Sequence, residues 1–292
     1  MSDNRYGNVW ENAGYVSIDA GGVDVENLMR PRPHRIMSIV RETKAEFTFR
    51  VEFKYPTKNG QFCMLSIPKV GEAPISISGK GKDYVEFTIR KVGRLTDGVF
   101  NLREGNMIFL RGPFGHPWPV EEEFAGADKH LVIISGGTGL APVRTTINYF
   151  YNNPDRIASL YLISGFKDET GALFNEERDS WSKAEKFHTI YTLDNSVAPG
   201  FETGMVTAHL EKIPFESFGD NYSVAIVGPP PMMHFSALGL MKLGVPAEKI
   251  WVSFERKMQC AIGKCGHCKI NETYVCLEGP VLHYPKAKEL FD

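Results

Sequence analysis

The fold is decided by one stretch of this 292-residue chain, Leu131-Val132-Ile133-Ile134-Ser135-Gly136-Gly137-Thr138-Gly139-Leu140-Ala141-Pro142. Its first residues form a short apolar run typical of a buried strand, and the glycines that follow predict a tight turn. Pro142 suits the first turn of a helix, where its missing N–H costs nothing. A glycine-rich turn between a strand and a helix lets a pyrophosphate approach backbone N–H groups and the positive helix end. Five residues of this turn are therefore candidates for binding NAD: Gly136, Gly137, Thr138, Gly139 and Pro142.

Patterns typical of strand, loop and helix alternate on both sides of this stretch, over residues from about 125 to 250. Longer amphipathic segments, at Pro142–Tyr151 and Leu173–Lys186, separate some of the short apolar runs. That alternation predicts a mostly parallel sheet wrapped by helices, an α/β nucleotide-binding domain. The expected strands are Leu131–Ser135, Ser159–Ser164, Thr189–Thr192, Ser223–Val227 and Ile250–Phe254.

A second turn that could contact a nucleotide follows the strand that ends at Val227. Two such loops at strand ends of one sheet would form a cleft, where ligands of open α/β sheets bind. Either loop alone is explained equally well as a tight turn, and only the pair favours nucleotide binding. The candidate residues in this second turn are Gly228, Pro229, Pro230 and Met232.

Residues from about 34 to 120 have a different pattern, with short runs rich in Phe, Val and Ile separated by turn residues. Several short strands at such spacing predict a small antiparallel β-barrel. Gly112-Pro113-Phe114-Gly115-His116-Pro117 is expected to end this pattern. The expected strands are His34–Arg41, Glu46–Phe53, Gln61–Pro68, Tyr84–Arg90 and Asn106–Arg111.

Composition excludes several classes of protein. The 33 basic and 35 acidic residues nearly cancel, so no global field favours nucleic acid or an anionic membrane. The first residues lack the basic and apolar regions of a secretory signal, and no apolar run approaches the roughly 20 residues that span a bilayer. We therefore expect a cytoplasmic protein without a membrane span. Residues 1–33 are expected to form an irregular arm, used either for packing or for docking a partner.

Four of the five cysteines lie close to the C-terminus, spaced Cys260-x4-Cys265-x2-Cys268-x7-Cys276. The spacing C-x4-C-x2-C…C is typical of a plant-type [2Fe–2S] cluster held by four thiolates. Structural zinc is the alternative, but zinc ribbons usually pair two C-x2-C knuckles, and only one such knuckle exists here. The fifth cysteine, Cys63, stands in an apolar stretch and is expected to be a core residue. Residues 251–292 therefore predict a small [2Fe–2S] module.

The order of barrel, G-G-T-G-x-x-P sheet domain and four-cysteine module resembles the ferredoxin–NADP reductase superfamily. Within that superfamily lie the electron-transfer subunits of dihydroorotate dehydrogenase, of soluble hydrogenase (its gamma subunit) and of anaerobic sulfite reductase. The resemblance covers nearly everything from about residue 34 to 292, and the residues after Cys276 look most like the electron-transfer subunit of sulfite reductase. Three stretches narrow the resemblance to the hydrogenase and sulfite reductase subunits: 70–78, Phe254-Glu255-Arg256-Lys257-Met258 and Ile262-Gly263-Lys264-Cys265-Gly266-His267-Cys268.

The resemblance implies a flavin on the barrel. The superfamily's R-x-Y-S motif corresponds here to Ala73-Pro74-Ile75-Ser76, which places Ile75 against the flavin ring and the Ser76 hydroxyl near its reactive nitrogen. Ala73 replaces the motif's arginine, so Arg90 is the expected substitute at the flavin phosphate. In the superfamily a G-x-x-[ST] stretch, here Gly93-Arg94-Leu95-Thr96, holds the pyrophosphate, which implies FAD rather than FMN. Taken alone, Pro74–Ser78 could also be a plain barrel strand. The candidate FAD-binding residues are Pro74, Ile75, Ser76, Ile77, Ser78, Arg90, Gly93, Leu95 and Thr96.

These modules together predict an electron-transfer subunit that oxidises NAD(P)H through FAD and passes single electrons through the cluster to a partner. NADH is expected as the preferred donor because Asp194 would repel a 2′-phosphate and no Lys or Arg lies between Lys186 and Lys212, although Lys167 argues the other way. The expected partners are the iron–sulfur and siroheme subunits of anaerobic sulfite reductase, with a NiFe hydrogenase as the alternative. Rival interpretations of another class are a non-catalytic nucleotide sensor and a zinc-stapled structural subunit.

Overall fold

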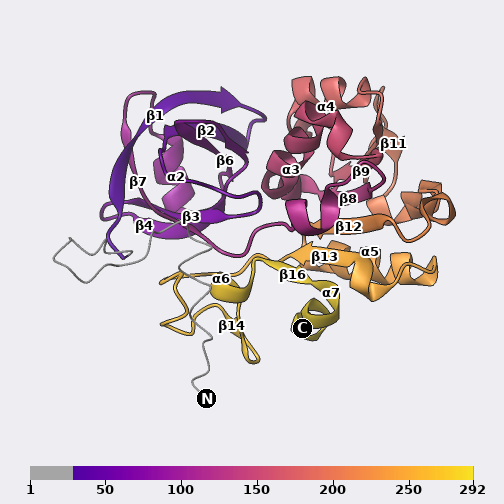
Figure 1. Ribbon diagram of the computed structural model, residues 1–292. Helices are drawn as coiled ribbons and strands as arrows, with labels where there is room; N and C mark the ends of the chain where they lie inside the picture. The colour runs from indigo at the N-terminus through magenta and orange to yellow at the C-terminus, as the bar shows by residue number, and fades with distance from the viewer. Residues whose placement is uncertain (1–28, 292) are drawn as a thin grey trace, which may run out of the picture.

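The computed structural model describes residues 29–291, and Figure 1 shows two lobes with a smaller C-terminal unit beneath them. Most of the predicted arm, residues 1–28, lies outside the described residues. Strand β1 begins at Arg32, so the end of the predicted arm belongs to the first sheet. Within residues 29–291, no helix is long and apolar enough to cross a membrane.

The first lobe is built on a seven-stranded antiparallel sheet (indigo to purple in Figure 1). Large apolar side chains such as Phe49 and Phe87 alternate along its strands and are fully buried between them. Helix α2 (Arg94–Phe100) packs against β3 and β4. The strands run in the order β4 (Gly71–Ser76), β3 (Phe62–Ile67), β7 (Met107–Phe114), β1 (Arg32–Arg41), β2 (Glu46–Glu52), β6 (Tyr84–Arg90) and β5 (Gly79–Lys80).

The second lobe is a seven-stranded, mostly parallel sheet with helices packed against it. Its central strands are continuous runs of Val, Ile and Leu, as expected for strands that are covered on both faces. The strands run in the order β11 (Glu202–Thr203), β10 (Phe187–Leu193), β9 (Ser159–Phe166), β8 (His130–Gly136), β12 (Tyr222–Val227), β13 (Ile250–Ser253) and β16 (Val281–His283). Its main helices are α3 (Leu140–Asn152), α4 (Asn175–Ser182) and α5 (Pro230–Lys242).

The C-terminal unit is joined to both lobes. Strand β16 pairs antiparallel with β13 and forms one edge of the second sheet. A bridge between His116 and Pro280, with a hydrogen bond of 2.6 Å from the His116 N–H to the Gly279 carbonyl, ties the unit to the end of the barrel. Its other elements are β14 (Lys269–Ile270), β15 (Thr273–Tyr274), α6 (Val275–Glu278) and α7 (Tyr284–Ala287).

The fold class matches the prediction, and the details differ in five places. Strand β7 runs through Gly112-Pro113 to Phe114 instead of ending at Arg111, because the chain keeps its pairing with β3 there. The stretch that begins at Arg94 forms helix α2, and the triple proline opens helix α5. The predicted helix Leu173–Lys186 is shorter, spanning Asn175–Ser182. The cysteine segment supplies an edge strand to the α/β sheet, so it is more than an appended tail.

Candidate functional site: a cavity between the lobes and a cysteine loop beside it

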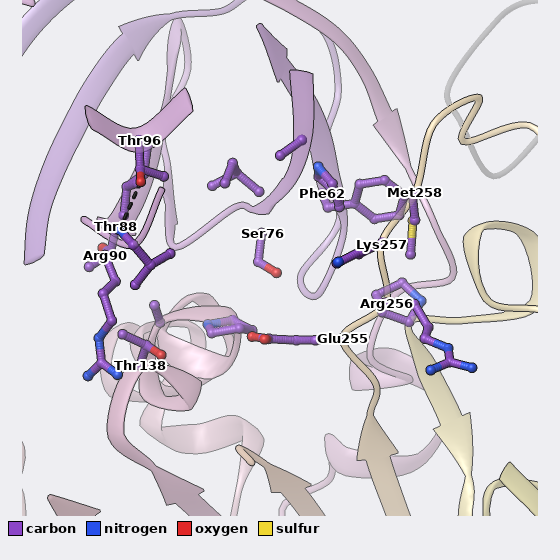
Figure 2. A pocket seen from close by; sticks show the side chains of 18 of the residues that line it. Phe62, Ser76, Thr88, Arg90, Thr96, Thr138, Glu255, Arg256, Lys257 and Met258 are labelled. Carbon is purple, nitrogen blue, oxygen red and sulfur yellow. Dashed lines mark hydrogen bonds between the residues drawn. The ribbon is translucent and has the colours of Figure 1, made fainter. Parts of the chain in front are cut away.

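A cavity of about 660 Å³ opens between the barrel, the start of α3 and the segment that follows β13. Cofactor and ligand pockets usually measure roughly 300–1,000 Å³, so this volume suits an organic cofactor. Figure 2 shows side chains from all three parts pointing toward its centre. The lining residues are Phe62, Ala73, Pro74, Ile75, Ser76, Thr88, Ile89, Arg90, Val92, Thr96, Thr138, Ala141, Pro142, Phe254, Glu255, Arg256, Lys257, Met258 and Pro280.

One wall of the cavity is strand β4, which carries three of the predicted flavin contacts, Pro74, Ile75 and Ser76. The strand lies at the edge of its sheet and pairs only with β3, where Cys63 is the partner of Ile75. Its residues from 73 to 76 are therefore half-buried, with one side of the strand open to the cavity. An apolar strand edge that ends in a hydroxyl suits a flat, heteroaromatic ring.

Arg90 and Thr96 line the opposite end of the cavity, beside Thr138 of the glycine-rich loop (Figure 2). The Arg90 guanidinium forms an ion pair of 2.5 Å with Glu46, and one of its nitrogens lies 3.9 Å from where a side chain at Gly137 would begin. The Thr96 hydroxyl accepts hydrogen bonds from the N–H groups of Val92 and Gly93, at 2.9 and 3.0 Å. Arg90 thus brings a cation close to the glycine-rich loop at this end of the cavity, which suits a phosphate group.

Other predicted flavin residues do not line this cavity. Ile77 and Ser78 are fully buried: Ile77 belongs to the barrel core, and the Ser78 hydroxyl accepts a hydrogen bond of 2.8 Å from Thr88. Their side chains therefore face the barrel interior, because β4 ends at Ser76 and the chain turns inward. Gly93 and Leu95 flank Thr96 but are not part of the lining.

The two predicted nucleotide loops pack directly against each other. A side chain at Gly139 would begin only 2.5 Å from the Val227 carbonyl oxygen, and one at Gly136 would begin 2.4 Å from the Met232 sulfur. Gly228 has a φ of +157°, and a side chain there would begin 3.0 Å from Met232. The glycines are therefore required by the close approach of the loops. Of these residues only Thr138 and Pro142 reach the cavity; Gly136, Gly137, Gly139, Gly228, Pro229, Pro230 and Met232 lie outside its lining.

The stretch Phe254–Met258 has no role assigned from sequence, and the structure brings all five of its residues to the cavity. Figure 2 shows Glu255 pointing inward below Ser76, with Lys257 and Arg256 to one side. Burial between the walls raises the pKa of the Glu255 carboxyl, and the charge of Arg90 opposes this in part. The position of this stretch directly between an apolar strand and the cysteine motif was the signal that could have identified it.

Asp194 lies just after β10, away from the cavity, and is exposed. Its N–H donates a hydrogen bond of 2.9 Å to the Phe166 carbonyl, and partial burial raises the pKa of its carboxyl. Two cations near it in sequence are engaged elsewhere: Lys212 pairs with Glu202 at 2.9 Å, and Arg178 donates to the Leu173 carbonyl at 2.9 Å.

The cysteine motif forms a loop with its sulfurs in two pairs. The Cys265 N–H donates to the Cys260 sulfur at 3.4 Å, which brings these two residues together. A hydrogen bond between Cys276 and Cys268 brings the second pair together and lowers the pKa of the Cys268 thiol. Cys63 is buried in the barrel core, as predicted.

This arrangement fits a [2Fe–2S] cluster, in which each of two irons takes two protein ligands. Within residues 29–291, no three His, Cys, Asp or Glu side chains are grouped around one point as a single metal ion requires. The N–H groups of Gly263 and Lys264 each lie 3.3 Å from a cysteine sulfur. Gly263 has a φ of +68°, so a left-handed backbone conformation helps to turn these N–H groups toward the sulfurs.

Comparison with known proteins agrees with this division of the chain. A family model described as an oxidoreductase NAD-binding domain matches residues 133–237. A second model, the iron–sulfur cluster binding domain of dihydroorotate dehydrogenase B, matches residues 255–287. The chain is 35% identical over 258 residues to the sulfhydrogenase 1 subunit gamma of Pyrococcus furiosus, covering 83% of this chain and 86% of that subunit.

The chain belongs to the family of the sulfhydrogenase gamma subunits and the dihydroorotate dehydrogenase B electron-transfer subunits. Two further relatives agree with this family. The sulfhydrogenase 2 subunit gamma of Pyrococcus furiosus is 30% identical over 92% of this chain and 96% of its own length. A probable dihydroorotate dehydrogenase B electron transfer subunit of Methanocaldococcus jannaschii is 31% identical over 87% of this chain and 90% of its own length.

Solved structures share the fold of this electron-transfer subunit at lower identity. An NADH-dependent reduced ferredoxin–NADP oxidoreductase matches with a TM-score of 0.68 and 21% identity, covering 93% of this chain and 94% of that one. A ferredoxin–NADP reductase from Neisseria gonorrhoeae matches with a TM-score of 0.65 and 18% identity, covering 76% of this chain and 97% of that one. The predicted sulfite reductase partner is not confirmed by these comparisons, and the hydrogenase alternative is the one they favour.

Proposed function

We propose that this chain oxidises NADH through FAD bound in the cavity and passes single electrons through a [2Fe–2S] cluster to hydrogenase subunits. One observation carries the proposal: the segment Phe254–Met258 forms a wall of the cavity and continues directly into the cysteine loop at Cys260. Along the chain, the cluster would therefore be the redox centre next to a cofactor bound in the cavity. It would receive the electrons that leave that cofactor.

The barrel residues would hold and orient the cofactor. Pro74 and Ile75 would lie against its ring, the Ser76 hydroxyl would face the reactive nitrogen, and Arg90 with Thr96 would bind its phosphates. FAD supplies, when bound, the conversion of one hydride into two single electrons. The chain contributes distance, order and exclusion of water; the mechanism requires no general base.

The second lobe would bind the nicotinamide donor, with the loop Gly136–Pro142 and the turn from Gly228 to Met232 holding its phosphates. We expect NADH to be preferred, because Asp194 is exposed just after β10 and an acidic group near the adenosine ribose would suit a free 2′-hydroxyl. The pairing of Lys212 with Glu202 supports this preference, since it occupies a cation that could otherwise meet a 2′-phosphate.

The partner is proposed from the relatives. Two sulfhydrogenase gamma subunits match most of the chain, which favours hydrogenase subunits as the electron acceptor or donor. Dihydroorotate dehydrogenase is the second candidate, because its iron–sulfur domain model matches residues 255–287. The division into an arm (1–33), a barrel domain (34–120), a nucleotide domain (125–250) and a cluster module (251–292) also remains a proposal.

The partner can be tested by purifying the native complex anaerobically through a tag on this chain. We expect hydrogenase subunits to copurify and the complex to couple NADH oxidation to hydrogen evolution, or hydrogen uptake to NAD⁺ reduction. Recovery of dihydroorotate dehydrogenase or sulfite reductase subunits instead, with the matching activity, would overturn the hydrogenase assignment. The isolated chain should reduce artificial acceptors with NADH. It should not act by itself on the substrate of hydrogenase, dihydroorotate dehydrogenase or sulfite reductase.

A further inference from the structure

Arg111 is a buried arginine of the barrel that reaches the cysteine loop. It lies on β7, and its side chain is only 3% exposed. Two of its nitrogens donate to the Glu72 carboxylate, at 2.8 and 2.7 Å, in a bidentate pair. The same guanidinium donates to the Cys260 carbonyl at 2.6 Å and also to the Gln259 carbonyl.

Every N–H of this guanidinium has an acceptor. An arginine carries five N–H donors. Glu72 takes two of them, the carbonyls of Gln259 and Cys260 take two, and the Met29 sulfur lies 3.7 Å from the nitrogen that binds Cys260. Such complete engagement fixes the planar group in one orientation. Lysine, with one charged point and three donors, could not reproduce this pattern.

The two groups that Arg111 joins belong to different parts of the site. Glu72 lies on β4, directly before Ala73 to Ser76 of the cavity wall. Cys260 is the first of the four cysteines. A single side chain therefore connects the strand that faces the cavity to the backbone of the cluster loop.

We infer that Arg111 and Glu72 form a positioning pair that fixes the cluster loop against the flavin strand, and that their opposite charges balance each other's effect on the reduction potential of the cluster. The inference rests on the proposed ligation by the four cysteines. A cation beside Cys260 stabilises the additional negative charge of a reduced cluster, and the Glu72 carboxylate offsets that effect. Burial makes both influences larger than they would be in water.

Substitution of the two partners should shift the reduction potential of the cluster in opposite directions. Glu72→Gln leaves the arginine charge uncompensated, so the potential of the cluster rises. Arg111→Gln leaves the carboxylate without its cation, so the potential falls. The double variant Arg111→Gln/Glu72→Gln returns close to the wild-type value, because the pair is neutral as a whole. A tenfold change in the ratio of reduced to oxidised cluster corresponds to about 59 mV for this one-electron couple.

The test is an anaerobic potentiometric titration of the cluster, followed by electron paramagnetic resonance, in the wild type and the variants. Iron and sulfide are measured first in each protein, and absence of iron from the wild type would refute the proposed function itself. Arg50→Gln is the control, because Arg50 also donates two hydrogen bonds to a carboxylate, to one oxygen of Glu86 between barrel strands, and we expect no shift. Arg111→Lys, which keeps the charge, should shift the potential much less than Arg111→Gln and slow electron transfer from flavin to cluster.

We expect Glu72→Gln and Arg111→Gln to shift the equilibrium by threefold or more in opposite directions. Shifts of the same sign, or no shift beyond that of Arg50→Gln, would overturn the inference. If Arg111→Gln does not fold, Glu72→Gln and Arg111→Lys decide. Loss of iron from Glu72→Gln would also overturn it, because the proposed pair tunes a cluster that the cysteines hold without Glu72.

Discussion

The barrel is fastened to its two neighbours by two arginines that work differently. Arg144, on α3, donates to Glu86 of the barrel at 2.6 Å and to Glu177 of α4 at 2.6 Å, and it reaches the Ser78 carbonyl at 3.2 Å. Arg111 binds the carboxylate of Glu72 in the barrel and two backbone carbonyls of the cysteine loop. The contact with the nucleotide lobe thus depends mainly on side-chain charge, whereas the contact with the cluster loop fixes backbone.

The difference has electrostatic consequences. Burial alone would lower the pKa of Arg144. The neighbouring carboxylates Glu177 and Glu86 outweigh this effect and raise the pKa above its usual value, so the guanidinium stays charged. Glu86 is shared with Arg50 of the barrel, so that contact is a network of two arginines and two carboxylates. The Arg111 contact contains one cation and one anion and is neutral. A neutral, backbone-directed contact is the kind that can hold a redox loop at constant distance.

The largest expected effect is the loss of the iron–sulfur cluster without loss of flavin reduction by NADH. Cys276→Ala removes one of the four proposed thiolate ligands, so bound iron should fall from about two per chain to nearly none. NADH should still reduce the flavin and, through it, an artificial acceptor, because the cavity does not contain Cys276. Iron analysis and stopped-flow absorbance measure the two effects. The control is Cys63→Ala, which alters a buried barrel cysteine and should keep its iron.

The second prediction concerns the contact with the nucleotide lobe. Arg144→Gln leaves Glu177 without its cation and Glu86 with Arg50 alone in a largely buried contact, which should destabilise the protein by on the order of 3 kcal/mol. The measurement is the midpoint of thermal unfolding, with the NADH-dependent reduction rate of the flavin as a second readout. Arg156→Gln, which breaks an exposed pair with Glu121, should change stability by less than about 1 kcal/mol. Equal effects of the two substitutions would contradict the role of Arg144.

The contacts of Arg111 and Arg144 could not be predicted from the sequence, whereas the glycine-rich loop could. The glycine-rich loop was predictable because strand, turn and helix signals lie within Leu131–Pro142. The partners of Arg111 lie 39 and 148 residues away along the chain, and Glu86 lies 58 residues from Arg144. No local pattern identifies such pairs, because each residue taken alone resembles an ordinary charged surface position.

Two short elements of the fold are also not predictable from the sequence. The helix that begins at Arg94 is one of them, because Gly93 before it and Gly98 within it disguise so short a segment. Strand β16 was missed because three residues carry too weak a period, and its pairing with β13 is decided by tertiary packing. Ile77 and Ser78 were expected at the flavin, but the end of β4 at Ser76 turns them inward.

The third prediction tests the packing of the two nucleotide loops. Gly139→Ala places a methyl group 2.5 Å from the Val227 carbonyl, which is backbone and cannot move aside cheaply. We expect a loss of about 1–3 kcal/mol in stability and a weaker affinity for NADH. Calorimetric unfolding and the KM for NADH measure the two effects. Gly171→Ala is the control: its new atom would lie 3.9 Å from its nearest neighbour, so little should change.

The smallest expected effect concerns the choice of nicotinamide donor. The wild type should favour NADH over NADPH by about tenfold or more in kcat/KM, and Asp194→Asn should reduce this ratio severalfold by removing a charge that repels the 2′-phosphate. Glu202→Gln provides a comparison, since it frees Lys212 and should also favour NADPH. A wild-type preference for NADPH would show that Asp194 does not face the ribose.

The central claim is that one chain converts a hydride into single electrons by joining a flavin cavity to an iron–sulfur loop. Its most direct test is an anaerobic titration of the purified protein with NADH, followed by visible absorbance, after analysis of flavin, iron and sulfide. The account predicts one FAD, about two irons and two sulfides per chain, and bleaching of both chromophores by NADH. Stoichiometric zinc without iron, or a flavin that NADH does not bleach, would contradict it.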